Sequence, residues 1–192
     1  MLLVVLLIMT YFLASIPFSL IISRSRGIDL RTVGSGNLGA TNVGRVMGFK
    51  WGVLVFFLDW TKGFLPITLL IAVYPFSYGL HVLAAFLAVF AHSFSVFVKF
   101  KGGKGAATGL GVLAALHLPT FLLVFMIGVA IIYFSRMVSV ATIVCCVLIP
   151  IFLVLFSAPM AYGVGMGVAS AFIISRHKAN ILRLLKGTEN KL

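Results

Sequence analysis

Long runs of apolar residues separated by short polar segments dominate the chain. The first run, from Met1 to Ile22, contains no charged side chain. A helix needs about 20 mainly apolar residues to cross a hydrocarbon core of ~30 Å. The pattern therefore predicts an all-α polytopic membrane protein in which seven transmembrane helices form a bundle. The expected spans are residues 1–22, 51–73, 80–98, 106–118, 119–134, 137–156 and 160–175.

The stretch from Ala106 to Phe134 allows more than one interpretation. Residues 106–118 are short for a crossing at ~1.5 Å per residue, so they could belong to one long bent helix or to a re-entrant segment. A single span here would export the basic C-terminal tail. A break near His117 and Pro119 is therefore favoured. Residues 1–22 are expected to stay as a first helix, because they lack the positive start of a signal peptide.

Charge gives the chain an orientation. Lys and Arg number 15 against 3 Asp and Glu, a formal net charge of +12. All of these cations except Lys62 lie in residues 24–50, 99–104, 136 and 176–191, which are every second gap between the spans. Basic loops face the cytoplasm, so the N-terminus is expected outside and the C-terminus in the cytoplasm. The longest polar stretch cannot form its own core, so residues 1–192 are expected to be a single integral membrane domain.

The composition limits the classes of binding partner that the chain can have. With 62% hydrophobic and 9% charged residues, the chain has no soluble fold that could present its positive charge to a nucleic acid. Anionic lipid headgroups are the expected partners of the basic loops. Cys145 and Cys146 are adjacent in one span with no metal ligand close in sequence, and are expected to be packing residues. No metal and no cofactor is expected.

The first polar cluster, residues 35–42, reads Ser-Gly-Asn-Leu-Gly-Ala-Thr-Asn and is followed by Gly44 and Arg45. Glycine lets backbone amides approach an anion closely, while Ser, Thr and Asn side chains add hydrogen bonds. A plain turn has a similar composition. The length of the run and the arginine after it favour an anion-binding loop.

The second cluster, residues 101–105, reads Lys-Gly-Gly-Lys-Gly and leads directly into the helix expected from Ala106. Unpaired amides at a helix N-terminus, together with a lysine, favour phosphate. The cluster is not the phosphate loop of ATPases. Val98 stands where the first glycine belongs, and Gly105 replaces the Ser or Thr that would hold magnesium.

The third cluster, residues 177–189, follows the last span. At helical spacing His177, Asn180 and Leu184 share one face, and Gly187 is expected to end the helix. An amphipathic helix whose cations rest on lipid phosphates is the alternative interpretation. Three such clusters on one membrane face favour a common site.

Carboxylates are scarce: only Asp29, Asp59 and Glu189 are present. A magnesium site with several clustered acids therefore cannot be built. No histidine is followed by an aspartate five positions later, which excludes the His-x4-Asp base of the CoA-dependent glycerolipid acyltransferases. Asp59 and Lys62, three residues apart in one span, are expected to form an ion pair that lowers the cost of burying charge, and a functional role for the pair stays open.

These clusters together resemble the three sequence motifs of the bacterial acyl-phosphate:glycerol-3-phosphate 1-acyltransferases, in order and over nearly the whole chain. The resemblance implies a multi-pass enzyme of the bacterial inner membrane with its active site on the cytoplasmic face. It implies transfer of an acyl chain from acyl phosphate to the 1-hydroxyl of sn-glycerol 3-phosphate, which yields 1-acyl-glycerol 3-phosphate (lysophosphatidic acid) and phosphate for phospholipid biosynthesis. Monomers and oligomers are both compatible with the sequence.

A mixed anhydride is already activated, so the protein mainly positions two anions and stabilises the oxyanion. His177 is the one conventional base, but the acyl phosphate could accept the proton instead. A covalent acyl intermediate on Ser35 is disfavoured, since no base is paired with it. The predicted catalytic residues are Ser35, Arg45, Lys104, His177 and Asn180. The predicted substrate-binding residues are Gly36, Asn37, Gly39, Thr41, Asn42, Gly102, Gly103, Gly105 and Arg183, with Glu189 as a structural charge partner of a nearby Lys or Arg.

Two other classes of protein offer alternatives. An organic-phosphate transporter would also carry anion sites at helix ends, but it needs polar or broken helices near the midplane, where spans five and six offer little beyond Ser139 and Thr142. A scaffold that only binds anionic lipids would tolerate replacement of the glycines.

Overall fold

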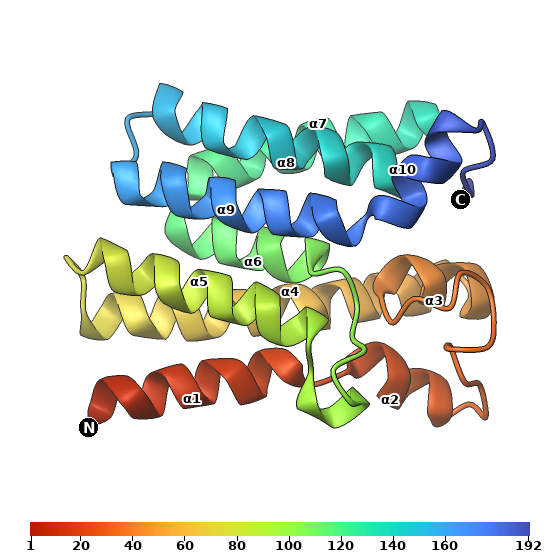
Figure 1. The fold of residues 1–192 in the computed structure, drawn as a ribbon, viewed down its shortest axis with the longest axis horizontal. Helices are drawn as coiled ribbons and strands as arrows, with labels where there is room; N and C mark the ends of the chain where they lie inside the picture. Colours follow the sequence, from red (N-terminus) through yellow and green to blue (C-terminus); the bar gives the residue numbers. More distant parts are fainter.

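Apolar helices run side by side along one axis (Figure 1). The computed structural model describes residues 1–192, and the prediction of an all-α protein is confirmed. The elements in chain order are α1 (Leu2–Ser15), α2 (Phe18–Arg24), α3 (Ala40–Met47), α4 (Phe49–Val73), α5 (Tyr78–Ser93), the short 3₁₀ helix η1 (Val96–Val98), α6 (Ala106–Leu116), α7 (Leu118–Ser135), α8 (Val138–Leu155), α9 (Met160–Arg176) and α10 (Lys178–Leu185).

Each predicted span coincides with helical structure. Five stretches are long and apolar enough to cross a membrane: Leu2–Arg24, Phe49–Val73, Tyr78–Val98, Leu118–Ser135 and Val138–Leu155. The helices α6 and α9 are apolar but shorter, with 11 and 17 residues. At ~1.5 Å per residue α6 measures about 17 Å. The expected break at His117 is confirmed, because α6 ends before it and α7 begins after it. A count of seven crossings stays a prediction.

The first predicted span is broken at Ile16 and Pro17, between α1 and α2, although it was expected to be one helix. Proline cannot continue a helix, and a break at membrane depth must find partners for its carbonyls. Ser95 Oγ donates to Ser15 O at 2.6 Å, and Lys62 Nζ donates to Ile16 O at 2.8 Å. Lys62 Nζ also lies 2.8 Å from Asp59 Oδ1, and both side chains are at most 3% exposed. The expected ion pair is therefore confirmed. Its lysine also supplies the hydrogen bond for the Ile16 carbonyl at the break.

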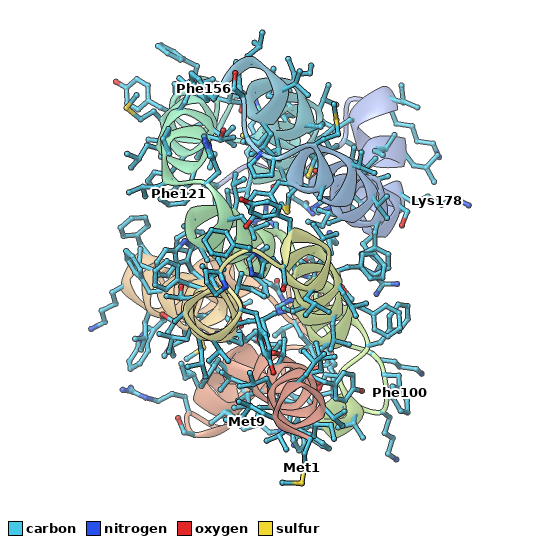
Figure 2. All side chains as sticks on the ribbon, turned by 90° about the vertical axis from the view of Figure 1, so that its left-hand side faces the viewer. Met1, Met9, Phe100, Phe121, Phe156 and Lys178 are labelled. Carbon is cyan, nitrogen blue, oxygen red and sulfur yellow. The ribbon has the colours of Figure 1, made fainter.

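The two chain termini lie at opposite ends of the bundle (Figure 1). The connections α4–α5, α6–α7 and α8–α9 lie at the end that holds the N-terminus. The basic segments around α2–α3, the α7–α8 connection and α10 lie at the other end, which we call the basic end. Figure 2, viewed along the bundle, shows Met9, Phe100 and Lys178 at its outer edge. The remaining basic segment, residues 99–104 between α5 and α6, lies nearer the middle of the bundle (Figure 1). No basic segment lies at the end that holds the uncharged connections, as the predicted orientation requires.

Helix α6 packs on α4 through glycines. A Cβ on Gly63 would lie 2.2 Å from Thr108 O, and one on Gly111 would lie 1.9 Å from Trp60 O, so the two backbones touch. Because α6 begins only at Ala106, near the middle of the bundle, it does not reach the basic end (Figure 1). The space that a longer α6 would fill between α4, α7 and α8 is where the cavity described next is found.

Candidate active site

A cavity of about 420 Å³ lies among α3, α4, α6, α7, α8 and α9. Side chains or backbone of all three polar clusters line it, although the clusters are far apart in the sequence. The predicted site residues in its wall are Ser35, Asn37, Gly39, Thr41, Asn42, Arg45, Lys104, Gly105, His177, Asn180 and Glu189. The expectation that the clusters meet is therefore confirmed. Gly36, Gly102, Gly103 and Arg183 lie outside the wall.

Asn42 organises the first cluster. Its Oδ1 accepts a hydrogen bond from Ser35 N at 2.8 Å, and its Nδ2 donates to Val33 O at 3.2 Å and Leu30 O at 3.4 Å. A Cβ on Gly34, which has a φ of +60°, would lie 2.2 Å from Asn42 Oδ1. The buried amide thus pins the loop ahead of α3 and fixes where Ser35 enters the cavity wall.

The second cluster brings one lysine and a helix N-terminus to the cavity. Lys104 Nζ donates to Asn180 Oδ1. Gly105, with a φ of +86°, is the N-cap of α6. The first backbone hydrogen bond of α6 comes from Gly109 N, which leaves the amides of Ala106 and Ala107 free in the cavity wall. Free amides at a helix N-terminus favour an anion.

Gly102 and Gly103 are placed differently from the expectation. A Cβ on Gly102 would lie 2.0 Å from His92 O, and one on Gly103 would lie 2.2 Å from His92 Nε2 and 2.5 Å from Leu38 O. Gly102 N also donates to Ser93 O at 2.9 Å. The structure thus shows these glycines letting the loop lie against the end of α5. Their predicted contact with substrate stays a prediction.

His177 connects α9 and α10. Its Nδ1 donates to Ile173 O at 2.8 Å, so the lone pair of the neutral ring is on Nε2. Burial is the main cause that lowers the pKa of His177 to about 4, and the neighbouring Lys104 and Arg176 act in the same direction. The imidazole is therefore neutral at pH 7.

Glu189 ties the third cluster together. Asn180 Nδ2 donates to its Oε1 at 2.6 Å, Ser139 Oγ to the same oxygen at 2.9 Å, and Arg183 Nε to Oε2 at 2.9 Å. Burial acts to raise the pKa of Glu189, but these hydrogen bonds and the Arg183 charge bring it below its ordinary value. The carboxylate is thus ionised and is the expected charge partner of a nearby cation, which is Arg183.

The polar part of the cavity carries excess positive charge. Arg45 and Lys104 in the wall, together with Arg183 beside it, are set against the carboxylate of Glu189. Burial and the charges of Arg183, Arg45 and Arg176 lower the pKa of Lys104 to about 8, while Glu189 acts in the opposite direction. Burial also lowers the pKa of Arg45, yet an arginine stays charged. This part of the cavity, which we call the cationic mouth, is suited to phosphate.

An apolar arm continues from the cationic mouth between α7, α8 and α9. On α8 the cavity wall runs from Ser139 to Ile149, which is about 15 Å along the helix. Between α4 and α7, Phe57 and Val129 line the cavity although 57% and 51% of their surfaces are exposed. The arm therefore opens sideways, toward the apolar surroundings of the bundle.

Some residues of the wall were not anticipated as site residues. His92 lies 3.2 Å from Thr108 Oγ1 and 3.8 Å from Asp59 Oδ1, in both cases through Nδ1. Its one sequence signal was an ionisable side chain within an apolar span. Ser139 and Ser170 also line the cavity, and no sequence pattern distinguishes them. The expected packing residues Cys145 and Cys146 are buried and lie in the wall of the apolar arm.

Comparisons with known proteins agree with this geometry. The family model described as glycerol-3-phosphate acyltransferase matches residues 4–187. The glycerol-3-phosphate acyltransferase of Aquifex aeolicus (strain VF5) is 45% identical over 188 residues, 97% of each chain. That of Fusobacterium nucleatum subsp. nucleatum is 42% identical over 187 residues, 96% of this chain and 95% of the relative.

Two solved structures have the same fold. Both are crystal structures of PlsY (YgiH), an integral membrane glycerol 3-phosphate acyltransferase. The glycerol 3-phosphate form has a TM-score of 0.94 and 42% sequence identity, and the lysophosphatidic acid form has a TM-score of 0.91 and 40% identity. Each comparison covers 100% of this chain and 96% of the other.

Proposed function

Since the chain belongs to the glycerol-3-phosphate acyltransferase family, an integral membrane family whose activity yields lysophosphatidic acid, we propose that its acyl donor is acyl phosphate and its acceptor the 1-hydroxyl of sn-glycerol 3-phosphate. One observation carries this proposal: the cationic mouth is continuous with an apolar arm. Acyl phosphate has a charged head and a long apolar tail, and it matches both parts. Glycerol 3-phosphate needs only the mouth.

The acyl phosphate head is assigned to Lys104 and the free amides at the N-terminus of α6. These groups lie where α6 begins beside the apolar arm, so the tail can follow the wall of α8. An arm of about 15 Å takes roughly twelve carbons, at ~1.2 Å per bond of an extended chain. A longer tail would reach the sideways opening between Phe57 and Val129.

The glycerol 3-phosphate is assigned to Arg45, Ser35, His177 and Asn180. Arg45 offers a planar guanidinium, which suits a phosphate better than an ammonium group does. Asn180 already joins Lys104 to Glu189, so it would hold the acceptor at a fixed position next to the donor. Bringing the hydroxyl to within attacking distance of the acyl carbonyl is the main contribution that an activated donor requires.

The proton of the attacking hydroxyl is assigned to the phosphate of the donor. His177, with a pKa of about 4, is a weak acceptor at pH 7, whereas a phosphate group has a second pKa of about 6. No imidazole or ammonium group hydrogen-bonds to Ser35 Oγ in the structure, which supports direct transfer over an acyl-serine. Lys104 and Arg45 would offset the negative charge that develops on the carbonyl oxygen and on the leaving phosphate.

The membrane arrangement is part of the proposal. Residues 1–192 form one domain with seven crossings, the N-terminus outside, and the cationic mouth facing the cytoplasm of a bacterial inner membrane. The absence of basic residues from the connections at the end that holds the N-terminus supports this orientation. Cysteine labelling of single-Cys variants in the α4–α5 and α7–α8 connections tests it, and labelling of both from the same side would contradict it.

Phosphate release from purified protein in detergent tests the reaction. We expect release only when acyl phosphate and glycerol 3-phosphate are both present. When acyl-CoA replaces acyl phosphate, we expect neither 1-acyl-glycerol 3-phosphate nor free CoA thiol to form. The variant Arg45→Lys keeps the charge but loses the planar guanidinium, so its KM for glycerol 3-phosphate should rise. No phosphate release, combined with uptake of glycerol 3-phosphate by vesicles that contain the protein, would support a transporter instead.

A further inference from the structure

The C-terminal tail, residues 187–192, folds back over the cationic mouth. Arg45 Nη2 donates to Asn190 O at 2.9 Å, and Arg45 Nε donates to Lys191 O at 3.4 Å. These residues are about 145 positions apart in the chain. Leu192 contributes to the wall of the cavity. The tail thus meets, through its backbone, the arginine to which we assign a substrate phosphate.

The tail is itself anchored on both sides of this contact. Gly187, with a φ of +67°, turns the chain after α10, and Glu189 is held by Ser139, Asn180 and Arg183. Leu192 N donates to Arg136 O at 2.7 Å, in the connection between α7 and α8. The carbonyls of residues 190 and 191 are therefore fixed between two anchors.

The contact with the tail leaves only part of the Arg45 guanidinium available to a ligand. Two of its three guanidinium nitrogens donate to the tail, and Nη1 donates to no group of the chain. A free arginine side chain has many rotamers, and a bound anion must then bear the entropic cost of ordering it. Two backbone acceptors already order this side chain, and they hold it in the cavity wall.

We propose that the backbone of residues 190–192 is a positioning element, which aims Arg45 at a phosphate bound in the cationic mouth. The substrate identity in this inference rests on the proposed function, while the orientation of Arg45 does not. The side chains of Asn190 and Lys191 are exposed, so the backbone carbonyls carry the effect. No residue of the tail takes part in the chemistry.

Deletion of residues 190–192 tests the proposal by steady-state kinetics. We expect KM to rise about tenfold, as for loss of a charge-assisted hydrogen bond, with a smaller change in kcat, and for the same substrate that Arg45→Ala affects. Replacing residues 190–192 by three alanines restores the carbonyls, and KM should return to within about twofold of wild type. Arg45→Ala combined with the deletion should be no worse than Arg45→Ala alone.

Three results would overturn the proposal: a wild-type KM in the deletion variant, a tri-alanine variant as impaired as the deletion, or effects of Arg45→Ala and the deletion that multiply. If the deletion variant unfolds, Leu192→Pro keeps the chain length but removes the N–H that Arg136 accepts, and an unchanged KM would then count against the proposal. Should the wild type release no phosphate, the proposed function fails. Calorimetric binding of inorganic phosphate to the same variants would still decide the role of the tail.

Discussion

Two of the chain's clusters of charged side chains are built differently. At the break of the first span, one carboxylate, Asp59, faces one ammonium, Lys62, which also donates to Ile16 O. At the cationic mouth, Arg45 and Lys104, with Arg183 just outside the wall, face the carboxylate of Glu189. The first cluster is neutral and buried, although Asp59 also contributes to the cavity wall. The second keeps positive charge that only a molecule from outside can neutralise, so the comparison separates charge that maintains the fold from charge that binds substrate.

The largest expected effect concerns the enclosed pair. Asp59→Ala leaves Lys62 buried without its partner, which costs about 3–5 kcal/mol of unfolding free energy. Thermal unfolding in detergent should show a large drop in the midpoint. Replacing both residues, by Asp59→Leu with Lys62→Met, should recover most of this loss but not all, since Ile16 O loses its donor. If Asp59→Ala were as stable as wild type, the Asp59–Lys62 pair would not maintain the fold.

The next effect concerns the mouth. Lys104→Ala removes a charged donor that faces substrate, which is worth about 1.5–3 kcal/mol, or roughly 10- to 150-fold in kcat/KM. The midpoint of thermal unfolding should change little, in contrast to Asp59→Ala. Lys101→Ala is the matched control, because this neighbouring lysine is exposed and lies outside the cavity wall. Equal losses of activity in the two lysine variants would show that general charge, not the site, is responsible.

A smaller effect is expected in the apolar arm. A Cβ on Gly128 would meet only Cys145 Sγ, at 3.2 Å, so a larger side chain enters the cavity. Gly128→Leu should lower kcat/KM about tenfold for long acyl donors and less for short ones. The ratio of kcat/KM for long donors to kcat/KM for short donors, measured on one preparation, serves as the internal control. An unchanged ratio would place the acyl chain elsewhere.

The smallest effect is a change in pH dependence. Lys104, with a pKa of about 8, is charged below this pH and loses its charge as the pH rises through it, so kcat/KM should fall above pH 8. Glu189 raises the pKa of Lys104, so Glu189→Gln should move this fall to lower pH. In Lys104→Arg the fall should disappear, because arginine stays charged. A fall that persists in Lys104→Arg would have another origin.

Much of the fold could be predicted because each span is a local property of the sequence. The break at Ile16 and Pro17 could not, since proline alone does not reveal which groups will satisfy the freed carbonyls. Here these groups come from Lys62 and Ser95, far along the chain. The break between α6 and α7 was predictable, because a single span there would have placed the basic C-terminal tail outside the cell.

The meeting of the three polar clusters was also predictable, since all of them were expected on one membrane face. The positions of Gly102 and Gly103 were not predictable, because the sequence does not show whether a glycine faces a ligand or a neighbouring backbone. Only the packing shows that His92 and Leu38 fill the space beside them. The contact between Arg45 and the tail was equally inaccessible, because it uses backbone carbonyls, which every residue has.

The shortness of α6 has a consequence for how the reactants travel. Moving each methylene of a fatty chain into water costs about 0.8 kcal/mol, so a tail that left the bilayer for every turnover would slow the cycle. With a sideways entrance beside Phe57 and Val129, donor and product can diffuse in two dimensions within one leaflet. Only the small water-soluble acceptor and, in the reaction proposed above, the released phosphate then exchange with the aqueous phase.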